Sequence, residues 1–473
     1  MKRTLKIVSF CLICCLLLVG FRKVYFYKHY GNWSITNLYE LPADSVEVLA
    51  AGDSHVLTTL NPAVIWEEQG IPCYTVSSEG QDIWLTYYRL VEALKTQNPR
   101  LIIVDVHNAV NSNEYSNDAA AVMGILGMKT SWNKFEAIRA SVTPDKYMDF
   151  LLEFPTYHTR YTELVRNDFQ NNYGDRYFED MKGFKPLFYS NPPAFLNDIS
   201  DVTECDDLTP KMEKYLRNII ELSEEHGIPL LLIAAPYWLI DEEEQRLYNR
   251  VDFIASEYGV EFVNFNLNIE EIGLIPEEDF ADPHHLSFSG SEKFSSYLGQ
   301  FIQEKYGFTD KRETPSYTSW DKNCMDYRQL AQDHELDSAE GIEEFIHLLN
   351  NPMYTVIISV RNTYQDQLIQ ELMESIGIDN ESYHTYGVWV LQSGQVINAI
   401  PWGSSQVWQW KIGGDDLQIS LGYGQTPEIT FAGEDYISVL DGINVLVYNN
   451  YRECVASSAG FNKDEGYRRV NAE

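Results

Sequence analysis

Two short segments carry residue types that together could form a nucleophilic site. The run VLAAGDSHV places Ser54 directly after an apolar stretch, and ADPHHL places Asp282 three positions before His285. A serine hydroxyl needs a neighbouring base to take its proton, and imidazole titrates near neutral pH. A carboxylate can hold the imidazole in the required tautomer. The pattern therefore predicts a catalytic triad of Ser54, His285 and Asp282 for acyl transfer.

Other interpretations of the same residues remain open. Gly-Asp-Ser after a strand is a common turn, in which Asp53 or Ser54 caps the next helix. A metallohydrolase could use Asp53, His107, His284 and His285, but their spacing matches no known ligand motif and no second-shell pattern is visible. We therefore expect no metal site and no cofactor.

Strands and helices that alternate along the chain would position these residues. The expected strands are continuous apolar runs, and amphipathic helices separate them. Such a pattern predicts an α/β fold, a three-layer α/β/α sandwich with a parallel sheet. Ser54 would lie at the carboxyl edge of this sheet, where ligands bind. The strands are expected at Ser45–Ala51, Pro72–Ser77, Leu101–Val106, Leu230–Ala235 and Glu261–Phe265, and the helices at Asp82–Thr96, Lys211–Glu225 and Glu242–Tyr258.

The same domain should span residues 44–307. Its last helix is expected to begin after Ser289, with Glu292 completing a capping box, and to end at Gly307. Residues 111–210 interrupt the alternation. An insertion of this length is not an ordinary loop, so we expect a helical cap that shapes the substrate cleft.

The amino terminus carries an apolar run, LKIVSFCLICCLLLVGF, preceded by basic residues. Its length is at the short end of what spans a bilayer. A cleaved signal peptide is the alternative, but no small-residue cleavage site follows the run. Residues 1–24 are therefore expected to be a single-pass membrane helix with a cytoplasmic amino terminus, which places the main domains outside the cytoplasm.

A second domain should follow a polar linker at residues 308–350. Residues 351–461 contain closely spaced strand candidates and one helix, which predicts a β-rich α+β domain, with a hairpin at Asp441-Gly442. Its aromatic residues suggest carbohydrate binding by exposed rings. Trp408 and Trp410 are expected in the core, and Trp389 and Trp402 at the surface.

Charge and cysteine content exclude some partners. The chain of 473 residues has a net charge of −35, so it should repel nucleic acid and anionic lipid surfaces. The cysteines show no CxxC pairing, which signals neither a zinc site nor a disulfide framework.

The order of these segments resembles the SGNH/GDSL hydrolase superfamily. In that family the nucleophilic serine lies in a Gly-Asp-Ser block after the first strand, and Asp-x-x-His lies near the domain end. The resemblance implies catalytic roles for Ser54, Asp282 and His285, and oxyanion donors at Gly80 and Asn108. Two departures are a histidine at position 55, where the family usually has leucine, and the absence of Gly-x-Asn-Asp around Asn108.

The membrane helix, the GDSH variant and the insertion look most like envelope-facing members, such as the DltD-like and alginate-acetylation groups. The second domain is faintly similar to the interleukin-like EMT inducer (ILEI) domain, through VLDGINVLVY. The resemblance implies a serine-dependent O-acyl esterase or O-acyltransferase acting on a cell-envelope or exported polysaccharide, with a membrane O-acyltransferase as a possible partner. The alternative is a non-catalytic glycan-binding or accessory protein of the same fold.

Overall fold

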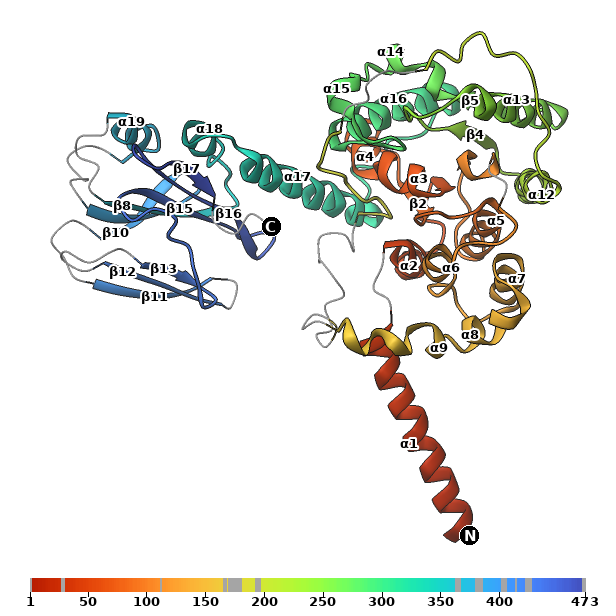
Figure 1. Ribbon diagram of the computed structural model, residues 1–473, viewed down its shortest axis with the longest axis horizontal. Helices are drawn as coiled ribbons and strands as arrows, with labels where there is room; N and C mark the ends of the chain where they lie inside the picture. Colours follow the sequence, from red (N-terminus) through yellow and green to blue (C-terminus); the bar gives the residue numbers. More distant parts are fainter. Residues whose placement is uncertain are drawn as a thin grey trace. The chain divides into compact units, whose positions relative to one another are not determined.

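The computed structural model describes residues 2–26, 30–110, 113–164, 168, 181–191, 197–361, 367–378, 386–400, 406–412, 415–421 and 428–469. The chain divides into two compact units, Met1–Met325 and Asp326–Glu473 (Figure 1). The first unit contains an α/β sandwich and the amino-terminal helix, and the second is rich in strands.

A parallel five-stranded sheet forms the centre of the first unit, in the order β2-β1-β3-β4-β5. Every residue of β1 to β4 is buried, which explains why these strands read as continuous apolar runs. The α/β prediction is confirmed. The strands are β1 (Val48–Gly52), β2 (Cys73–Ser77), β3 (Leu101–Asp105), β4 (Leu230–Ala234) and β5 (Glu261–Asn264).

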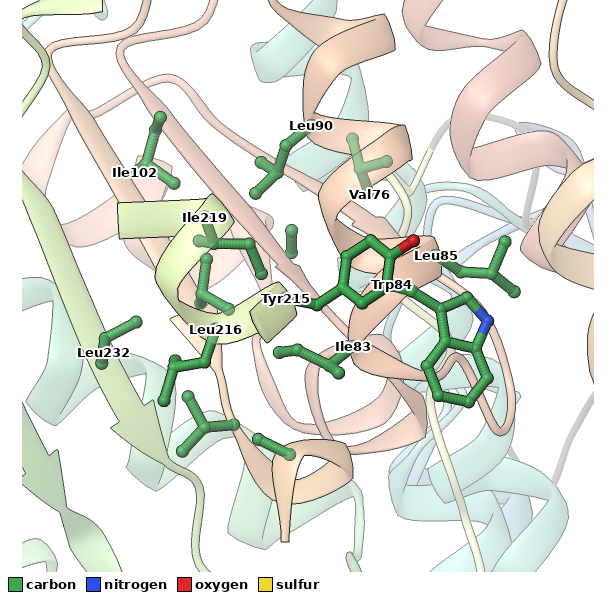
Figure 2. Packing of buried hydrophobic residues seen from close by; sticks show 14 of the residues in the cluster. Val76, Ile83, Trp84, Leu85, Leu90, Ile102, Tyr215, Leu216, Ile219 and Leu232 are labelled. Carbon is green, nitrogen blue, oxygen red and sulfur yellow. The ribbon is translucent and has the colours of Figure 1, made fainter. Parts of the chain in front are cut away.

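Helices cover both faces of this sheet, because successive strand residues point to opposite sides. Leu49 and Ala51 contribute to one core, which includes α5 (Ile83–Ala93), α12 (Pro210–His226) and α13 (Glu242–Glu257). Figure 2 shows residues of α5 and α12 meeting over the sheet. Val48 and Ala50 belong to the other core, which includes α3 (Ser54–Thr59), α4 (Pro62–Gln69) and α16 (Phe288–Tyr306). The result is the expected three-layer sandwich.

The carboxyl-terminal helix of the sandwich begins two residues earlier than the sequence suggests. The cap of α16 is Ser287, whose side chain accepts a hydrogen bond from the Gly290 N–H, and not Ser289. Ser289 instead donates to Asp279. The helix ends as expected at Gly307, which has a φ of 61°.

The insertion is helical where the structure describes it. Its helices are α6 (Asp118–Ile125), α7 (Trp132–Ser141), α8 (Tyr147–Leu152) and α9 (Phe154–Tyr157). Residues 181–191 then return along the sandwich through backbone hydrogen bonds. Lys185 N–H donates to Leu57, Phe288 N–H donates to Leu187, and Asn191 N–H donates to Phe280. This segment of the insertion is thereby fixed beside α3 and the start of α16.

Shorter elements complete the first unit: α2 (Tyr30–Thr36), η1 (Leu38–Glu40), η2 (His107–Ala109), η3 (Pro144–Lys146), η4 (His158–Thr162), η5 (Phe265–Leu267), α14 (Ile269–Ile272), α15 (Pro276–Asp279), β6 (Phe280–Asp282), β7 (His285–Leu286) and η6 (Pro315–Tyr317). The apolar run at the amino terminus forms α1 (Lys2–Tyr25). Its stretch Leu5–Tyr25 is long and apolar enough to cross a membrane, and none of it is buried against the protein. By length and composition it fits a membrane span or a signal sequence.

The second unit contains two antiparallel sheets. One has the order β10-β9-β8-β15-β16-β17 and the other β11-β12-β13-β14. The strands are β8 (Tyr354–Arg361), β9 (Tyr386–Gln392), β10 (Gln395–Ile400), β11 (Gln406–Ile412), β12 (Asp415–Leu421), β13 (Glu428–Phe431), β14 (Glu434–Asp435), β15 (Gly442–Asn449), β16 (Cys454–Asn462) and β17 (Gly466–Arg469), with α18 (Ile342–His347) and α19 (Gln367–Ser375). The β-rich prediction is confirmed.

Several details of the second unit differ from expectation. The predicted linker at 308–350 contains α17 (Thr318–Ser338) and α18, and the division between the units falls inside α17. No hairpin forms at Asp441-Gly442, because β14 and β15 belong to different sheets. Trp389 is only 2% exposed and packs in the core, so its expected surface position is wrong. Trp402 lies outside the described residues, as do the side chains of Trp408 and Trp410.

The helix α17 was missed because it changes its packing surface along its length. In the first unit, the Trp320 indole is buried and donates to the Cys73 carbonyl. In the second unit, Asp333 is buried and forms an ion pair with Arg452 and accepts a hydrogen bond from Tyr354. No single apolar stripe runs along such a helix, and periodicity therefore gives no signal.

Candidate active site

The candidate site lies at the point where the strand order reverses. The chain passes from β1 outward to β2 and then back across to β3, so the loops after β1 and β3 diverge. In open parallel sheets, the crevice formed at such a point is where ligands bind. Asp53 follows β1, Asp105 ends β3, and both carboxylates are buried.

The predicted Asp–His pair is formed. The Nδ1 atom of His285 lies 2.9 Å from each carboxylate oxygen of Asp282. Asp282 also accepts hydrogen bonds from the His284 N–H at 2.9 Å and from the Tyr189 hydroxyl at 3.1 Å. Burial raises the pKa of Asp282, but these hydrogen bonds and the His285 charge outweigh it and hold the pKa below its usual value. The carboxylate is therefore ionised and directs the His285 lone pair to Nε2.

Ser54 is the first residue of α3, a helix that packs against β7, the strand that contains His285. The Nε2 atom of His285 is buried and has no hydrogen-bond partner within the described part of the chain. The Ser54–His285 hydrogen bond of the predicted triad is thus not formed in this structure. Catalytic hydrogen bonds often tighten only when substrate binds, so the role of Ser54 stays a prediction.

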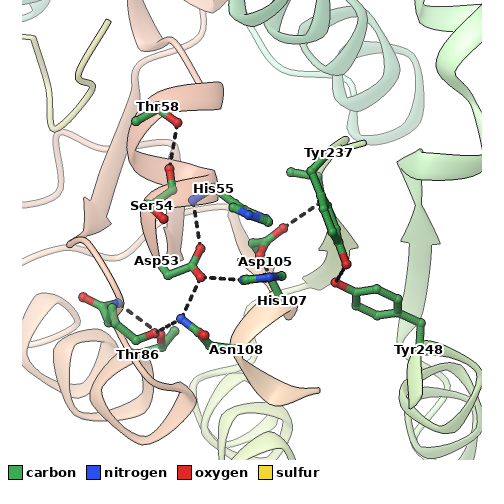
Figure 3. A network of polar contacts seen from close by, with 12 residues as sticks. Asp53, Ser54, His55, Thr58, Thr86, Asp105, His107, Asn108, Tyr237 and Tyr248 are labelled. Carbon is green, nitrogen blue, oxygen red and sulfur yellow. Dashed lines mark hydrogen bonds and ion pairs between the residues drawn. The ribbon is translucent and has the colours of Figure 1, made fainter. Parts of the chain in front are cut away.

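A second polar network surrounds Asp53 (Figure 3). Its Oδ2 atom lies 2.8 Å from His107 Nδ1 and accepts from the Asn108 amide at 2.6 Å, while Oδ1 accepts from the His55 N–H at 2.8 Å. Burial raises the pKa of Asp53, but the neighbouring histidines and their hydrogen bonds hold it well below its usual range. Burial lowers the pKa of His107, but the charge and hydrogen bond of Asp53, together with the charge of Asp105, outweigh it and raise the pKa above its usual value. The pair therefore favours a carboxylate and an imidazolium.

The two predicted oxyanion donors lie in different environments. The Asn108 amide donates to Asp53 and, at 2.8 Å, to the Gln81 carbonyl, so its hydrogens are directed to the protein. Gly80 adopts a φ of 61° in the turn after β2, a conformation that favours glycine. Their oxyanion roles stay predictions.

His55 is the most unusual residue of the site. Its side chain is 1% exposed, and neither ring nitrogen has a hydrogen-bond partner within the described residues. The ring stacks on His107 with 3.8 Å between centroids and meets His285 edge to face at 5.7 Å. Burial and the His107 charge lower the pKa of His55 well below its usual value. His55 is therefore a neutral imidazole at physiological pH.

Asp105 completes the buried charge arrangement. Its carboxylate accepts hydrogen bonds from the backbone N–H groups of His107 and Ala235. Burial and the nearby Asp53 raise the pKa of Asp105 to about 7. Two adjacent buried carboxyl groups do not both ionise readily, and Asp53 holds the charge because it has the histidine partner.

Sequence reasoning missed part of this site. Asp105 and Tyr189 received no role, and His55 was noted only because it stands where leucine is usual. Of the four residues considered for a metal site, His107 and His284 have nitrogens close to a nitrogen of His55, with the three atoms within 4.8 Å of one another. A second buried group of potential ligands consists of Asp53, His55 and Asp105. A carboxylate that contacts the second nitrogen of a ligand histidine could not be identified from the sequence, and the structure shows such a contact between Asp53 and His107.

The described cysteines are not disulfide-bonded. Cys73 is buried in the sheet, and Cys205 is exposed. The others are Cys14, Cys324 and Cys454.

Comparisons with known proteins return distant relatives. No curated protein matches the sequence, and one family model without a functional description matches residues 141–307. A GDSL-like lipase from Bacteroides thetaiotaomicron aligns at 11% identity and a TM-score of 0.30, over 58% of this chain and 99% of its own. A lipase/acylhydrolase from Enterococcus faecalis aligns at 11% identity and a TM-score of 0.28, over 55% and 97%.

A catalytic mutant of an acetylxylan esterase from Geobacillus stearothermophilus aligns at 13% identity and a TM-score of 0.27, over 56% of this chain and 96% of its own. These structural neighbours are described as a GDSL-like lipase, a lipase/acylhydrolase and an acetylxylan esterase. Their TM-scores are too low to establish a shared fold or function, so the geometry of the site has to carry the functional conclusion.

Proposed function

We propose that the chain is a serine-dependent O-acyl esterase or O-acyltransferase. The observation that carries this proposal is the state of His285. Its Nδ1 is bonded to an ionised Asp282, its Nε2 is buried without a partner among the described residues, and its strand packs against the helix that Ser54 begins. A ring oriented in this way has its lone pair available for a nearby hydroxyl.

In the proposed reaction, Ser54 Oγ attacks the carbonyl carbon of an acyl ester while His285 Nε2 takes the hydroxyl proton. The tetrahedral intermediate collapses, the bond to the alcohol oxygen breaks, and His285 returns the proton to the leaving alcohol. Asp282 stays ionised and stabilises the imidazolium during both steps. Water or a sugar hydroxyl then attacks the acyl-serine, which yields hydrolysis in the first case and transfer in the second.

The proposed substrate is an acylated cell-envelope or exported polysaccharide. The apolar helix α1 supports a location at the membrane, and residues 181–191 of the insertion lie beside α3, where the insertion could shape a cleft for a long substrate. We propose a single-pass topology with both units outside the cytoplasm, and a membrane O-acyltransferase as the source of acyl groups. Expected substrates are small O-acyl esters on sugars.

Labelling with a fluorophosphonate probe tests the nucleophile. The full chain in detergent should become labelled, and Ser54→Ala and His285→Ala should lose the label. Ser200→Ala, at an exposed serine, is the matched control and should label like the native protein. Equal labelling of native protein and Ser54→Ala would refute the assignment.

Turnover separates the two reaction types. Acetate release from aryl acetates or acetylated oligosaccharides, measured with and without sugar acceptors, distinguishes hydrolysis from transfer. If the native chain is neither labelled nor active while it binds envelope glycans, the protein is an accessory glycan-binding protein.

A further inference from the structure

A cluster of three histidines lies beside the proposed serine site and takes no part in the proposed acyl transfer. His55 follows β1, His107 follows β3, and His284 lies in the turn before β7. One nitrogen of each ring lies within 4.8 Å of the other two. The exposure of the three residues increases from the buried His55 through the half-buried His107 to the exposed His284, so the cluster is open to solvent on one side.

We propose that His55, His107 and His284 bind one divalent transition-metal ion of the zinc class. Three neutral imidazoles form the protein ligand set of open zinc sites, in which water or substrate oxygen occupies the fourth position. Imidazole ligands favour zinc, copper, iron and nickel over magnesium and calcium. The class of ion follows from this nitrogen-only ligand set.

The state of His55 is the independent observation that points to a ligand. A buried imidazole normally hydrogen-bonds through at least one nitrogen, because unpaired buried polar atoms are costly. Both His55 nitrogens lack a partner within the described residues, although the side chain is 1% exposed. Packing alone leaves both atoms unsatisfied, whereas a metal ion satisfies one of them.

The surroundings of His107 are those of a metal ligand. Asp53 Oδ2 lies 2.8 Å from His107 Nδ1, which leaves Nε2, whose proton a bound ion would displace, as the nitrogen available to a metal. Metal-ligating histidines almost always use their second nitrogen to contact a carboxylate, a carbonyl or water. Asp53 is itself fixed by Asn108 and by the His55 N–H, so the orientation of the ring is set before an ion arrives.

Closure of the site requires the three nitrogens, now within 4.8 Å of one another, to move closer, and the stacked rings of His55 and His107 to turn toward the ion. A Zn–N bond of about 2.1 Å places tetrahedral ligand nitrogens about 3.4 Å apart. His284 lies in an exposed turn, and its backbone N–H donates to Asp282. An ion held there would therefore lie near the Asp282–His285 pair, with its open position available to water or to a substrate oxygen.

Cobalt titration tests the site without reference to activity. The full chain in detergent is stripped with a chelator and titrated with Co²⁺, which gives strong visible absorption only in tetrahedral-type sites. We expect saturation at one ion per chain and displacement by Zn²⁺. His284→Ala should abolish the bands without loss of fold, because this side chain is exposed, and Asp53→Asn should weaken Zn²⁺ binding by about 10–100-fold.

Two controls separate this site from other histidines and from the proposed activity. His226→Ala should bind Co²⁺ as the native chain does, because His226 lies at the end of α12 and its ring contacts the Leu222 carbonyl of the same helix. Ser54→Ala should keep the cobalt bands while it loses fluorophosphonate labelling. Absence of cobalt bands in the native chain, or bands that persist in His284→Ala, would overturn the metal proposal and leave the serine proposal untouched.

Discussion

Replacement of His55 by leucine should stabilise the metal-free chain, although it removes a residue from the centre of the site. Each buried polar atom without a partner costs about 1–3 kcal/mol. Leucine removes both unsatisfied nitrogens of His55 and fills a similar volume. Loss of the ring stack on His107 offsets about 0.5–1.5 kcal/mol of this gain. Taking the lower cost of about 1 kcal/mol for each nitrogen, we expect the free energy of unfolding to rise by about 0.5–1.5 kcal/mol.

The matched control is the same chemical change at the adjacent ring. His107→Leu removes the partner of the buried Asp53 carboxylate, so the free energy of unfolding should fall by about 1.5–3 kcal/mol. The two variants therefore shift stability in opposite directions. Thermal unfolding followed by circular dichroism, with chelator present, measures both shifts at about 2–4 °C per kcal/mol.

Added zinc should reverse the order of native protein and His55→Leu. An ion at 100 times its dissociation constant stabilises the native chain by about 2.7 kcal/mol. His55→Leu lacks one ligand and should gain much less. If His55→Leu is destabilised in chelator, the His55 nitrogens have partners, and the reasoning about both the buried ring and the metal site is refuted.

Four further predictions concern Asp105, the Asp282–His285 pair and the second unit. The pKa of Asp105 is raised to about 7 in the folded chain, whereas the unfolded chain releases this proton near pH 3.9. The free energy of unfolding should therefore fall as pH rises between about 4 and 7. Urea unfolding of Asp105→Asn should show a flatter pH profile over this range. Asp282→Asn should lower kcat for an aryl acetate by about 10⁴-fold. Tyr189→Phe should lower kcat less than tenfold, because the Asp282–His285 contact stays intact. Equal losses in the two variants would place Tyr189 in direct contact with substrate. Asp333→Ala should destabilise the second unit by about 3–5 kcal/mol, since it removes the carboxylate that pairs with the buried Arg452 side chain. A fragment of residues 352–461 should not give a cooperative melting transition, because it lacks α18 and the part of α17 that pack in this core.

The sheet was predictable because burial on both faces leaves a direct trace in the sequence. The run LLLIA at β4 has no polar position, and Gly227 and Gly307 end their helices in the left-handed conformation. The capping serine of α16 was harder to identify, because Ser287 and Ser289 both lie at the start of the helix and only the backbone geometry separates them. Such local choices depend on contacts with Glu278 and Asp279.

The histidine cluster was not predictable from spacing. His55 and His107 meet because β1 and β3 are neighbours in the sheet, although β2 lies between them in the chain. The contact between Asp282 and His285, by contrast, depends on a single turn, and it could be predicted because the two residues are three positions apart in the sequence. Non-local contacts of the first kind require the strand order, which no short motif encodes.

The return segment at 181–191 has a consequence for protein engineering. Three backbone hydrogen bonds, together with one from the Thr75 N–H to Lys182, tie this segment to the sandwich. Its side chains add to this anchoring, because Lys185 donates to Glu79, Tyr189 donates to Asp282, and the Phe188 ring stacks on Phe288. The helices of the insertion also share the core of the sandwich, through residues such as Ile125, Ile138 and Phe150. A redesigned cap that keeps these apolar positions and residues 181–191 would keep the same anchoring, so substrate preference could be changed without redesign of the sheet.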